Sequence, residues 1–181
     1  MEFSEIKKLA FGNGDTNCCT VISASIAFEK DYAKTYDFFR ARGRKDGRGI
    51  PWDQYEENLR ELGKIEGYKV QQFDRATDWD TRQNFFQDLA TGETLAVMGK
   101  KTSITIKNFR DYLPRGNYIF GISGHVLAVQ NGAVMDWTAD KKRNKKPGTS
   151  SARIFRIWKI EKIDKKLRPN KKAKYDFSSF V

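Results

Sequence analysis

The sequence has a single histidine, His125, and only two cysteines, Cys18 and Cys19, which are adjacent. Neighbouring cysteines rarely form a disulfide with each other because the geometry is strained, and no other thiol is available to either of them. A disulfide framework is therefore excluded, which indicates a reduced, cytoplasmic protein with two free thiols. Two adjacent cysteines and one distant histidine also lack the spacing of a closed zinc site, so neither a metal nor a cofactor is expected.

Long apolar runs are also missing. No stretch of about 18 apolar residues occurs, so no membrane span is expected. The first ten residues, MEFSEIKKLA, lack the apolar centre of a secretory signal. The 181 residues are 39% hydrophobic and 13% aromatic, which is enough for one sizeable core. We expect one domain over residues 1–163 and a basic tail over residues 164–181.

Acidic residues are scarce only towards the C-terminal end. Residues 1–140 contain 19 Lys and Arg against 20 Asp and Glu, whereas residues 141–181 contain 15 against 3. The net charge of +11 therefore belongs to the last quarter of the chain. Such a block attracts nucleic acid, an acidic protein or an anionic surface, or serves only as a solvated tail. The candidate contacts to nucleic acid or an acidic partner are Lys141, Lys142, Arg143, Lys145, Lys146, Lys165, Lys166, Arg168, Lys171, Lys172 and Lys174.

Hydrophobic periodicity predicts helices in the first part of the chain and strands in the second. Helices are expected at about residues 19–28, 31–43, 51–63 and 79–92, the third ending at Gly63. Strands are expected at residues 67–73, 94–100, 116–123, 124–130, 133–138 and 153–160, and residues 103–113 should hold a strand and a short helix. Helices followed by an antiparallel sheet make an α+β fold.

The dipeptide Asn131-Gly132 is the one most favoured in a two-residue hairpin turn. Counting outward from this turn, Ala128 faces Met135 and Leu127 faces Asp136. His125 and Asp136 are then diagonal neighbours, and strand alternation places both on the face that carries Leu127. We therefore expect the Asp136 carboxylate to orient the His125 imidazole.

Cys19 is expected at the N-terminus of a helix, where backbone N–H groups stabilise a thiolate. With His125 as the base and Asp136 as the orienting acid, Cys19 can serve as the nucleophile of a catalytic triad. Asn17 and Asn13 are the candidate amide donors to an oxyanion. The ordinary alternatives are a small buried cysteine, a structural histidine at a sheet edge and a surface acid beside a turn.

Three stretches carry a resemblance to a known family: NCCTVISASIAFEKDYAKTYDFF, GRGIPWDQYEENLRELG and LPRGNYIFGISGHVLAVQNGAVMDW. Together they resemble the papain-like cysteine peptidase superfamily, and within it a group of small, mostly uncharacterised phage and bacterial proteins. Alignment on Lys30-Asp31-Tyr32 places the cysteine of that group on Cys19. Cys18 then stands where the relatives carry an acid, and Ser23 and Ser25 interrupt a helix that is usually richer in alanine.

The resemblance implies a papain-like fold, in which N-terminal helices bearing the nucleophile pack on a C-terminal antiparallel sheet. It also implies a thiol hydrolase that cleaves an amide or isopeptide bond of a protein or peptide substrate. Such a protein would be a phage or bacterial accessory protein acting in the cytoplasm, that of the host if phage-encoded. The alternative is a catalytically silent papain-like module that binds nucleic acid or an acidic partner protein through its basic C-terminal segment.

Overall fold

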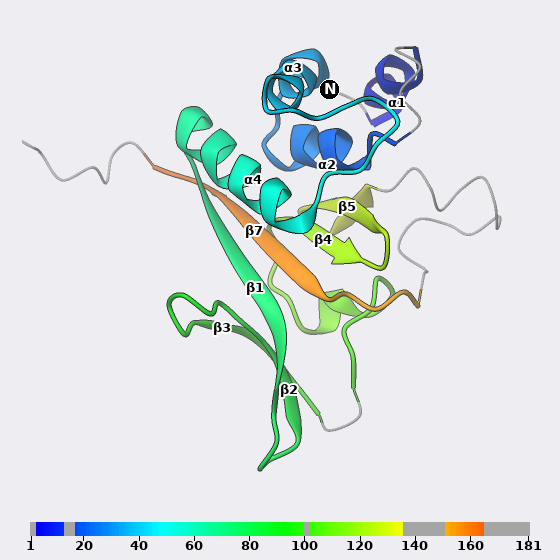
Figure 1. Ribbon diagram of the computed structural model, residues 1–181. Coiled ribbons are helices and arrows are strands. Elements are labelled where there is room, and N and C mark those ends of the chain that lie inside the picture. The colour runs from blue at the N-terminus through cyan, green and yellow to red at the C-terminus, as the bar shows by residue number, and fades with distance from the viewer. Residues whose placement is uncertain (1–2, 13–16, 100–101, 136–150, 165–181) are drawn as a thin grey trace, which may run out of the picture.

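The computed structural model describes residues 3–12, 17–99, 102–135 and 151–164 (Figure 1). Its helices are α1 (Phe3–Gly12), α2 (Cys19–Ala27), α3 (Tyr32–Ala41), α4 (Trp52–Glu66) and the short 3₁₀ helix η1 (Phe109–Asp111). Its strands are β1 (Tyr68–Asp78), β2 (Gln83–Gln87), β3 (Thr94–Met98), β4 (Asn117–Ile122), β5 (His125–Gln130), β6 (Ala133–Met135) and β7 (Arg156–Lys162). The four α-helices precede an antiparallel sheet, which confirms the expected α+β fold.

The seven strands form one sheet in the order β3-β2-β1-β7-β4-β5-β6, and all neighbours pair antiparallel. The last strand of the described residues, β7, lies in the middle and joins β1 to β4. The far ends of β1, β2 and β3 project beyond the helix-covered part of the sheet (Figure 1). The sheet therefore has a body, covered by helices, and a three-stranded extension.

The two faces of the body contribute to two hydrophobic clusters. Along β5, Val126 and Ala128 belong to the cluster beneath the helices, whereas Leu127 and Val129 belong to the cluster on the opposite face. The second cluster is closed by residues 104–113, where Phe109 of η1 meets Phe120 edge-to-face at 5.2 Å between ring centroids. This alternation follows from the two-residue period of a strand.

Helix α2 lies between the sheet and helices α1 and α3 (Figure 1). All nine of its residues are buried, and none of them is charged. It packs against β5 and β4 on one side and against α1 and α3 on the other. The position of Cys19 is therefore fixed by packing on every side of α2.

Helix α4 runs three residues beyond the expected end at Gly63 and ends instead at Gly67, whose φ is +76°. Gly63 has another role. A Cβ at this position would lie 2.7 Å from Cγ2 of Val70 and 2.9 Å from the carbonyl oxygen of Tyr68. Its missing side chain therefore allows α4 to lie directly against β1.

The helix expected over residues 79–92 is wrong, because Gln83–Gln87 form strand β2. Its buried residues, Asn84 and Phe86, are two apart rather than three or four. The turn that follows is built by Asp88, whose side chain accepts hydrogen bonds from the N–H groups of Ala90 and Thr91. The strand expected within 103–113 is also wrong, since the structure has only an isolated bridge between Thr105 and Arg153 there, followed by η1.

The predicted hairpin register is confirmed over the described residues. Gln130 pairs with Ala133 and Ala128 pairs with Met135. Asn131 and Gly132 both have positive φ, at 51° and 84°, as a type I′ turn requires. This hairpin places His125 at the beginning of β5.

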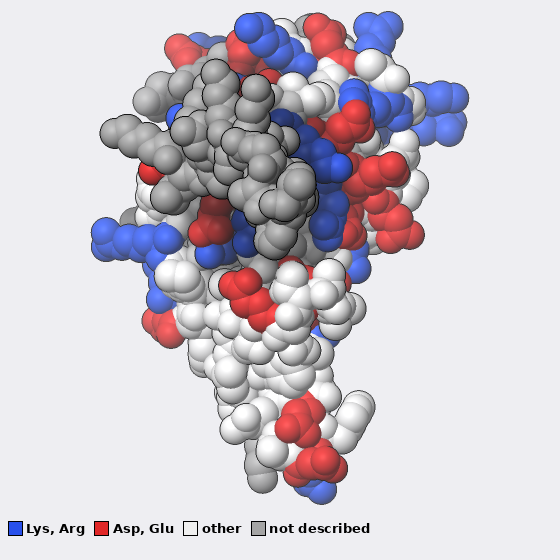
Figure 2. Space-filling model, turned by 90° about the vertical axis from the view of Figure 1, so that its left-hand side faces the viewer, with Lys and Arg blue, Asp and Glu red and all other residues white. Residues whose placement is uncertain are grey.

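On the face shown in Figure 2, charged side chains gather over the upper, helical part of the molecule, and the visible surface of the extension has few of them except near its tip. Trp79, Leu89 and Val97 of the extension are largely exposed. Within the described residues, no helix combines the length and apolarity needed to cross a bilayer. The expected tail over residues 164–181 lies outside them, except for Asp164.

We predict that Gly63→Ala destabilises the protein by about 1–3 kcal/mol, because the added methyl group would collide with β1. The gain in helix propensity, about 1 kcal/mol, opposes this cost but cannot remove the clash with a backbone oxygen. Urea unfolding followed by circular dichroism measures the change. Gly99→Ala is the control, since its nearest neighbour would be at an ordinary 3.5 Å. Equal stability of the two variants would contradict the packing role of Gly63.

Candidate active site

The two adjacent cysteines have different surroundings. Cys18 is the N-cap residue of α2, is completely buried, and accepts a hydrogen bond at its carbonyl oxygen from the N–H of Ile22 at 2.9 Å. Cys19 is the first residue of the helix and retains 8% exposure. It lines a pocket of about 160 Å³ at the end of α2, and both cysteines are free thiols. Only Cys19 is therefore open to a substrate.

His125 lines the same pocket from the sheet. It is the first residue of β5 and follows Gly124, whose φ of +67° completes the short turn from β4. Strict alternation would direct His125 to the far face with Leu127. At the end of a strand this restriction is weak, and the His125 side chain is instead a hydrogen-bond partner of Cys19 of α2. The expectation that His125 shares the face of Leu127 is therefore wrong, because α2 packs on the other face of β5.

The pKa of the Cys19 thiol is lower than that of an ordinary thiol. Burial is the largest single influence and raises this pKa. The hydrogen bond and positive charge of His125, with the N–H groups of Val126 and Thr20, together outweigh burial and lower it. The arrangement therefore stabilises a thiolate, which is the reactive form of cysteine.

Asn17, two residues before Cys19, also lines the pocket. Its Oδ1 accepts a weak hydrogen bond from Sγ of Cys19 at 3.9 Å. Its Nδ2 lies 3.7 Å from the position that a Cβ on Gly49 would occupy. Oδ1 of Asn17 thus faces the nucleophile, and Nδ2 lies towards Gly49, another residue that lines the pocket.

A buried arginine holds Asn17 in this place. Arg44 is 6% exposed, and its Nη2 donates to the carbonyl oxygen of Asn17 at 3.0 Å. Its Nη1 lies 3.3 Å from Oδ1 of Asp46, and its guanidinium lies 5.7 Å from the ring centroid of Tyr36. Arg44 therefore ties the loop before α4 to the residue two positions before Cys19.

Tyr55 of α4 supports the first turn of α2 from below. Its hydroxyl donates to the carbonyl oxygen of Thr20 at 3.0 Å and lies 2.8 Å from Oγ of Ser23. Burial raises the pKa of Tyr55, the Ser23 hydrogen bond opposes this, and the charge of Cys19 raises it further. Tyr55 therefore stays neutral and acts as a fixed hydrogen-bond donor beneath the pocket.

The structure brings together three of the residues singled out from the sequence: Cys19, His125 and Asn17. Asp136, Asn13 and every candidate basic contact lie outside the described residues. The proposed pairing of His125 with Asp136 therefore stays a prediction.

Sequence reasoning missed the roles of Arg44 and Tyr55. Arg44 stands in the basic stretch RGRKDGRG, which is typical of a solvated loop, and nothing in that pattern distinguishes the one buried guanidinium. Tyr55 stands in the helix expected over residues 51–63, where its spacing from Leu59 and Leu62 is typical of an ordinary buried face. Its hydroxyl contact to α2 depends on how α4 crosses that helix, which local sequence does not specify.

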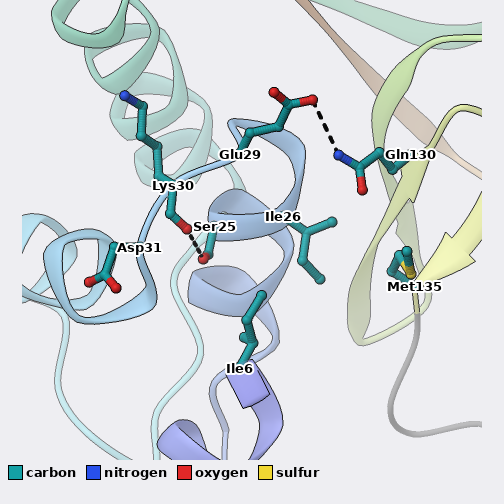
Figure 3. Close-up of a pocket in the computed structure, with 8 residues that line it drawn as sticks. All are labelled: Ile6, Ser25, Ile26, Glu29, Lys30, Asp31, Gln130 and Met135. Atoms are coloured by element: carbon teal, nitrogen blue, oxygen red, sulfur yellow. Dashed lines mark hydrogen bonds between the residues drawn. The ribbon is translucent and has the colours of Figure 1, made fainter. Parts of the chain in front are cut away.

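A larger hollow of about 480 Å³ lies at the opposite end of α2 (Figure 3). It includes Glu29, whose carboxylate accepts a hydrogen bond from Gln130 at 3.2 Å, and Ser25, whose hydroxyl donates to the carbonyl oxygen of Lys30 at 2.7 Å. Its lining contains neither the cysteines nor the histidine. This hollow is therefore separate from the thiol pocket.

Among the described residues, no three His, Cys, Asp or Glu side chains come together in a group that could hold a metal ion. Comparison of the chain with family models, with curated proteins and with solved structures gave no match. The function is therefore inferred from the pocket itself.

We predict that iodoacetamide alkylates Cys19 but not Cys18 in the folded protein, and that the reaction persists at pH values where an ordinary thiol is protonated. Lowering the pH should slow it only as the thiolate is protonated at its reduced pKa. In His125→Ala the pKa rises, and the rate at pH 6 should fall by about tenfold or more. Peptide mass spectrometry measures both cysteines, and a pH profile that is the same in the two proteins would contradict the proposed pairing.

Proposed function

We propose that this protein is a papain-like thiol hydrolase that cleaves an amide or isopeptide bond, with Cys19 as the nucleophile and His125 as its acid–base partner. The observation that carries the proposal is that Cys19, at the N-terminus of α2, and His125, at the start of β5, line one pocket. There the imidazole hydrogen-bonds the thiol and, with the N–H groups of Val126 and Thr20, lowers its pKa. A cysteine that only fills space in a core needs no neighbouring imidazole, and burial alone would raise its pKa. The cysteine helix packed on a histidine-bearing strand also supports the papain-like reading.

In the proposed reaction the Cys19 thiolate attacks the carbonyl carbon, and the carbonyl oxygen becomes an oxyanion. The imidazolium of His125 then gives its proton to the leaving amine as the C–N bond breaks, which leaves a thioester on Cys19. Water loses a proton to His125 and attacks this thioester. The carboxylic acid departs, and the thiolate–imidazolium pair is restored.

The oxyanion needs hydrogen-bond donors that are already in place. We assign this role to Nδ2 of Asn17, which lies towards Gly49 on the pocket wall, and to the backbone N–H of Cys19. Arg44 fixes the backbone at residue 17. Asp136 would orient the second imidazole nitrogen. This last role stays a prediction from the sequence, because Asp136 lies outside the described residues and the His125 side chain does not follow the Leu127 face on which the pairing was based.

The alternative of a silent module that binds nucleic acid or an acidic protein depends on residues 141–146 and 165–174, which lie outside the described residues. It stays a prediction from the sequence. The lowered pKa of the Cys19 thiol favours the hydrolase, because a binding module needs no activated thiol.

We predict that the protein hydrolyses p-nitrophenyl acetate through an acetyl-thioester, with a burst of p-nitrophenolate equal to the amount of enzyme. Cys19→Ala should abolish the burst, and Cys18→Ala should keep it, because only Cys19 lines the pocket. Stopped-flow absorbance gives the burst, and mass spectrometry gives the +acetyl adduct. Equal bursts in the two variants would contradict the assignment of the nucleophile.

The Asn17→Ala variant distinguishes stabilisation of the oxyanion from activation of the thiol. We expect Asn17→Ala to lower the acylation rate by about 10²-fold, the usual loss of one oxyanion donor. Alkylation by iodoacetamide forms no oxyanion and should change far less. If both rates fell by the same factor, Asn17 would act on the thiol or on the fold, and not on the oxyanion.

A further inference from the structure

Another hollow of about 480 Å³, distinct from the one in Figure 3, adjoins the Cys19 pocket. The two share Trp52 of α4 and Gly124 of the β4–β5 turn, so a chain bound at Cys19 can extend from one into the other. Its remaining wall comes from the turn after β4, from β1 and from the start of β7. Because the hollow opens beside the nucleophile, it is placed to receive a group that flanks the bond under attack.

Aromatic rings form the apolar part of this hollow. The Trp52 ring stacks on Trp158 at 5.7 Å between centroids, with 20° between the planes. A Cβ on Gly121 would come within 3.0 Å of the Trp52 ring, so glycine lets that ring lie flat against the sheet. Trp52 is 40% exposed and Phe155 is 49% exposed, which leaves both with apolar surface available to a ligand.

The charges in the hollow do not cancel. Asp74 accepts a hydrogen bond from Nε of Arg156 at 2.6 Å and another from Nε2 of Gln72 at 2.8 Å, so its charge is balanced and both its oxygens are occupied. Asp53 is exposed in the first turn of α4. Among the described residues, no cation forms an ion pair with it. The hollow therefore combines an aromatic wall with one uncompensated negative charge.

We propose that this hollow is a subsite for the lysine or arginine side chain of a polypeptide substrate, next to the bond that Cys19 attacks. The aliphatic part of such a side chain would lie along Trp52 and Phe155, and its cation would meet the Trp52 face and the Asp53 carboxylate. A carboxylate side chain would be repelled by Asp53, and a purely apolar one would leave that charge without a partner. The inference rests on the proposed function, because it assigns the substrate class of the same site.

The test uses peptidyl chloromethyl ketones that alkylate Cys19 and differ in one residue only: lysine, norleucine or glutamate. The variable residue is placed either first or second from the reactive carbon. Each rate of alkylation is divided by the iodoacetamide rate of the same protein. In one of the two positions we expect lysine to react about tenfold faster than norleucine, from one cation–π contact and one ion pair, and glutamate to react slowest.

Asp53→Asn should remove the lysine preference, whereas Glu57→Gln should keep it, since Glu57 is also exposed on α4 but does not line the hollow. Added salt should lower the preference in the wild type, because an exposed ion pair is screened. Equal normalised rates for lysine and norleucine in both positions, a preference for glutamate, or equal effects of the two variants would overturn the subsite. A slow iodoacetamide reaction at pH 6 would instead contradict the proposed function, so the two failures are distinguishable.

Discussion

The contact between the first turn of α2 and the first residues of β5 is the interaction on which the account depends. It brings a thiol, an imidazole and two backbone N–H groups together where a helix end meets a strand end. Burial alone would keep the Cys19 thiol protonated, and the neighbouring charge and donors reverse that effect. Everything else near the pocket serves to hold these two element ends in position: the Tyr55 hydroxyl under α2, the Arg44 guanidinium at Asn17, and the packing of α2 against β5.

The architecture explains why this contact can be rigid. Strand β7 returns from the end of the described chain to the middle of the sheet, where Trp158 stacks with Trp52 and meets Tyr55 edge-to-face. The same stack thus supports α4, Tyr55, and the wall that the Cys19 pocket shares with the hollow proposed as the subsite. Gly121 on β4 gives the Trp52 ring its room. A substitution in this stack would disturb the nucleophile and the neighbouring subsite together, although none of its rings takes part in the chemistry.

Sequence reasoning predicted the parts of the site that depend on local rules. The helix beginning at Cys19 and the Asn131-Gly132 hairpin with its register both follow from short-range patterns, and the structure has both. The predictions failed where contacts between distant parts of the chain determine the local structure. The Phe85-Phe86 segment has apolar residues that suit a helix, yet pairing with β1 and β3 makes it a strand. Gly63 was expected to end its helix, but α4 continues to Glu66. The glycine is needed there because the helix lies against β1 at this position. The buried Arg44 belongs to the same class, since only the fold selects one arginine from a basic loop.

The most direct measurement of the central claim is an NMR titration of His125, whose imidazole signals need no assignment because the chain has no other histidine. If His125 lowers the pKa of the Cys19 thiol, the thiolate must in turn favour the protonated imidazole, since the coupling is reciprocal. We expect His125 of the wild type and of Cys18→Ala to titrate at higher pH than His125 of Cys19→Ala. Identical titration curves in all three proteins would show that the thiol and the imidazole do not interact, and would contradict the account.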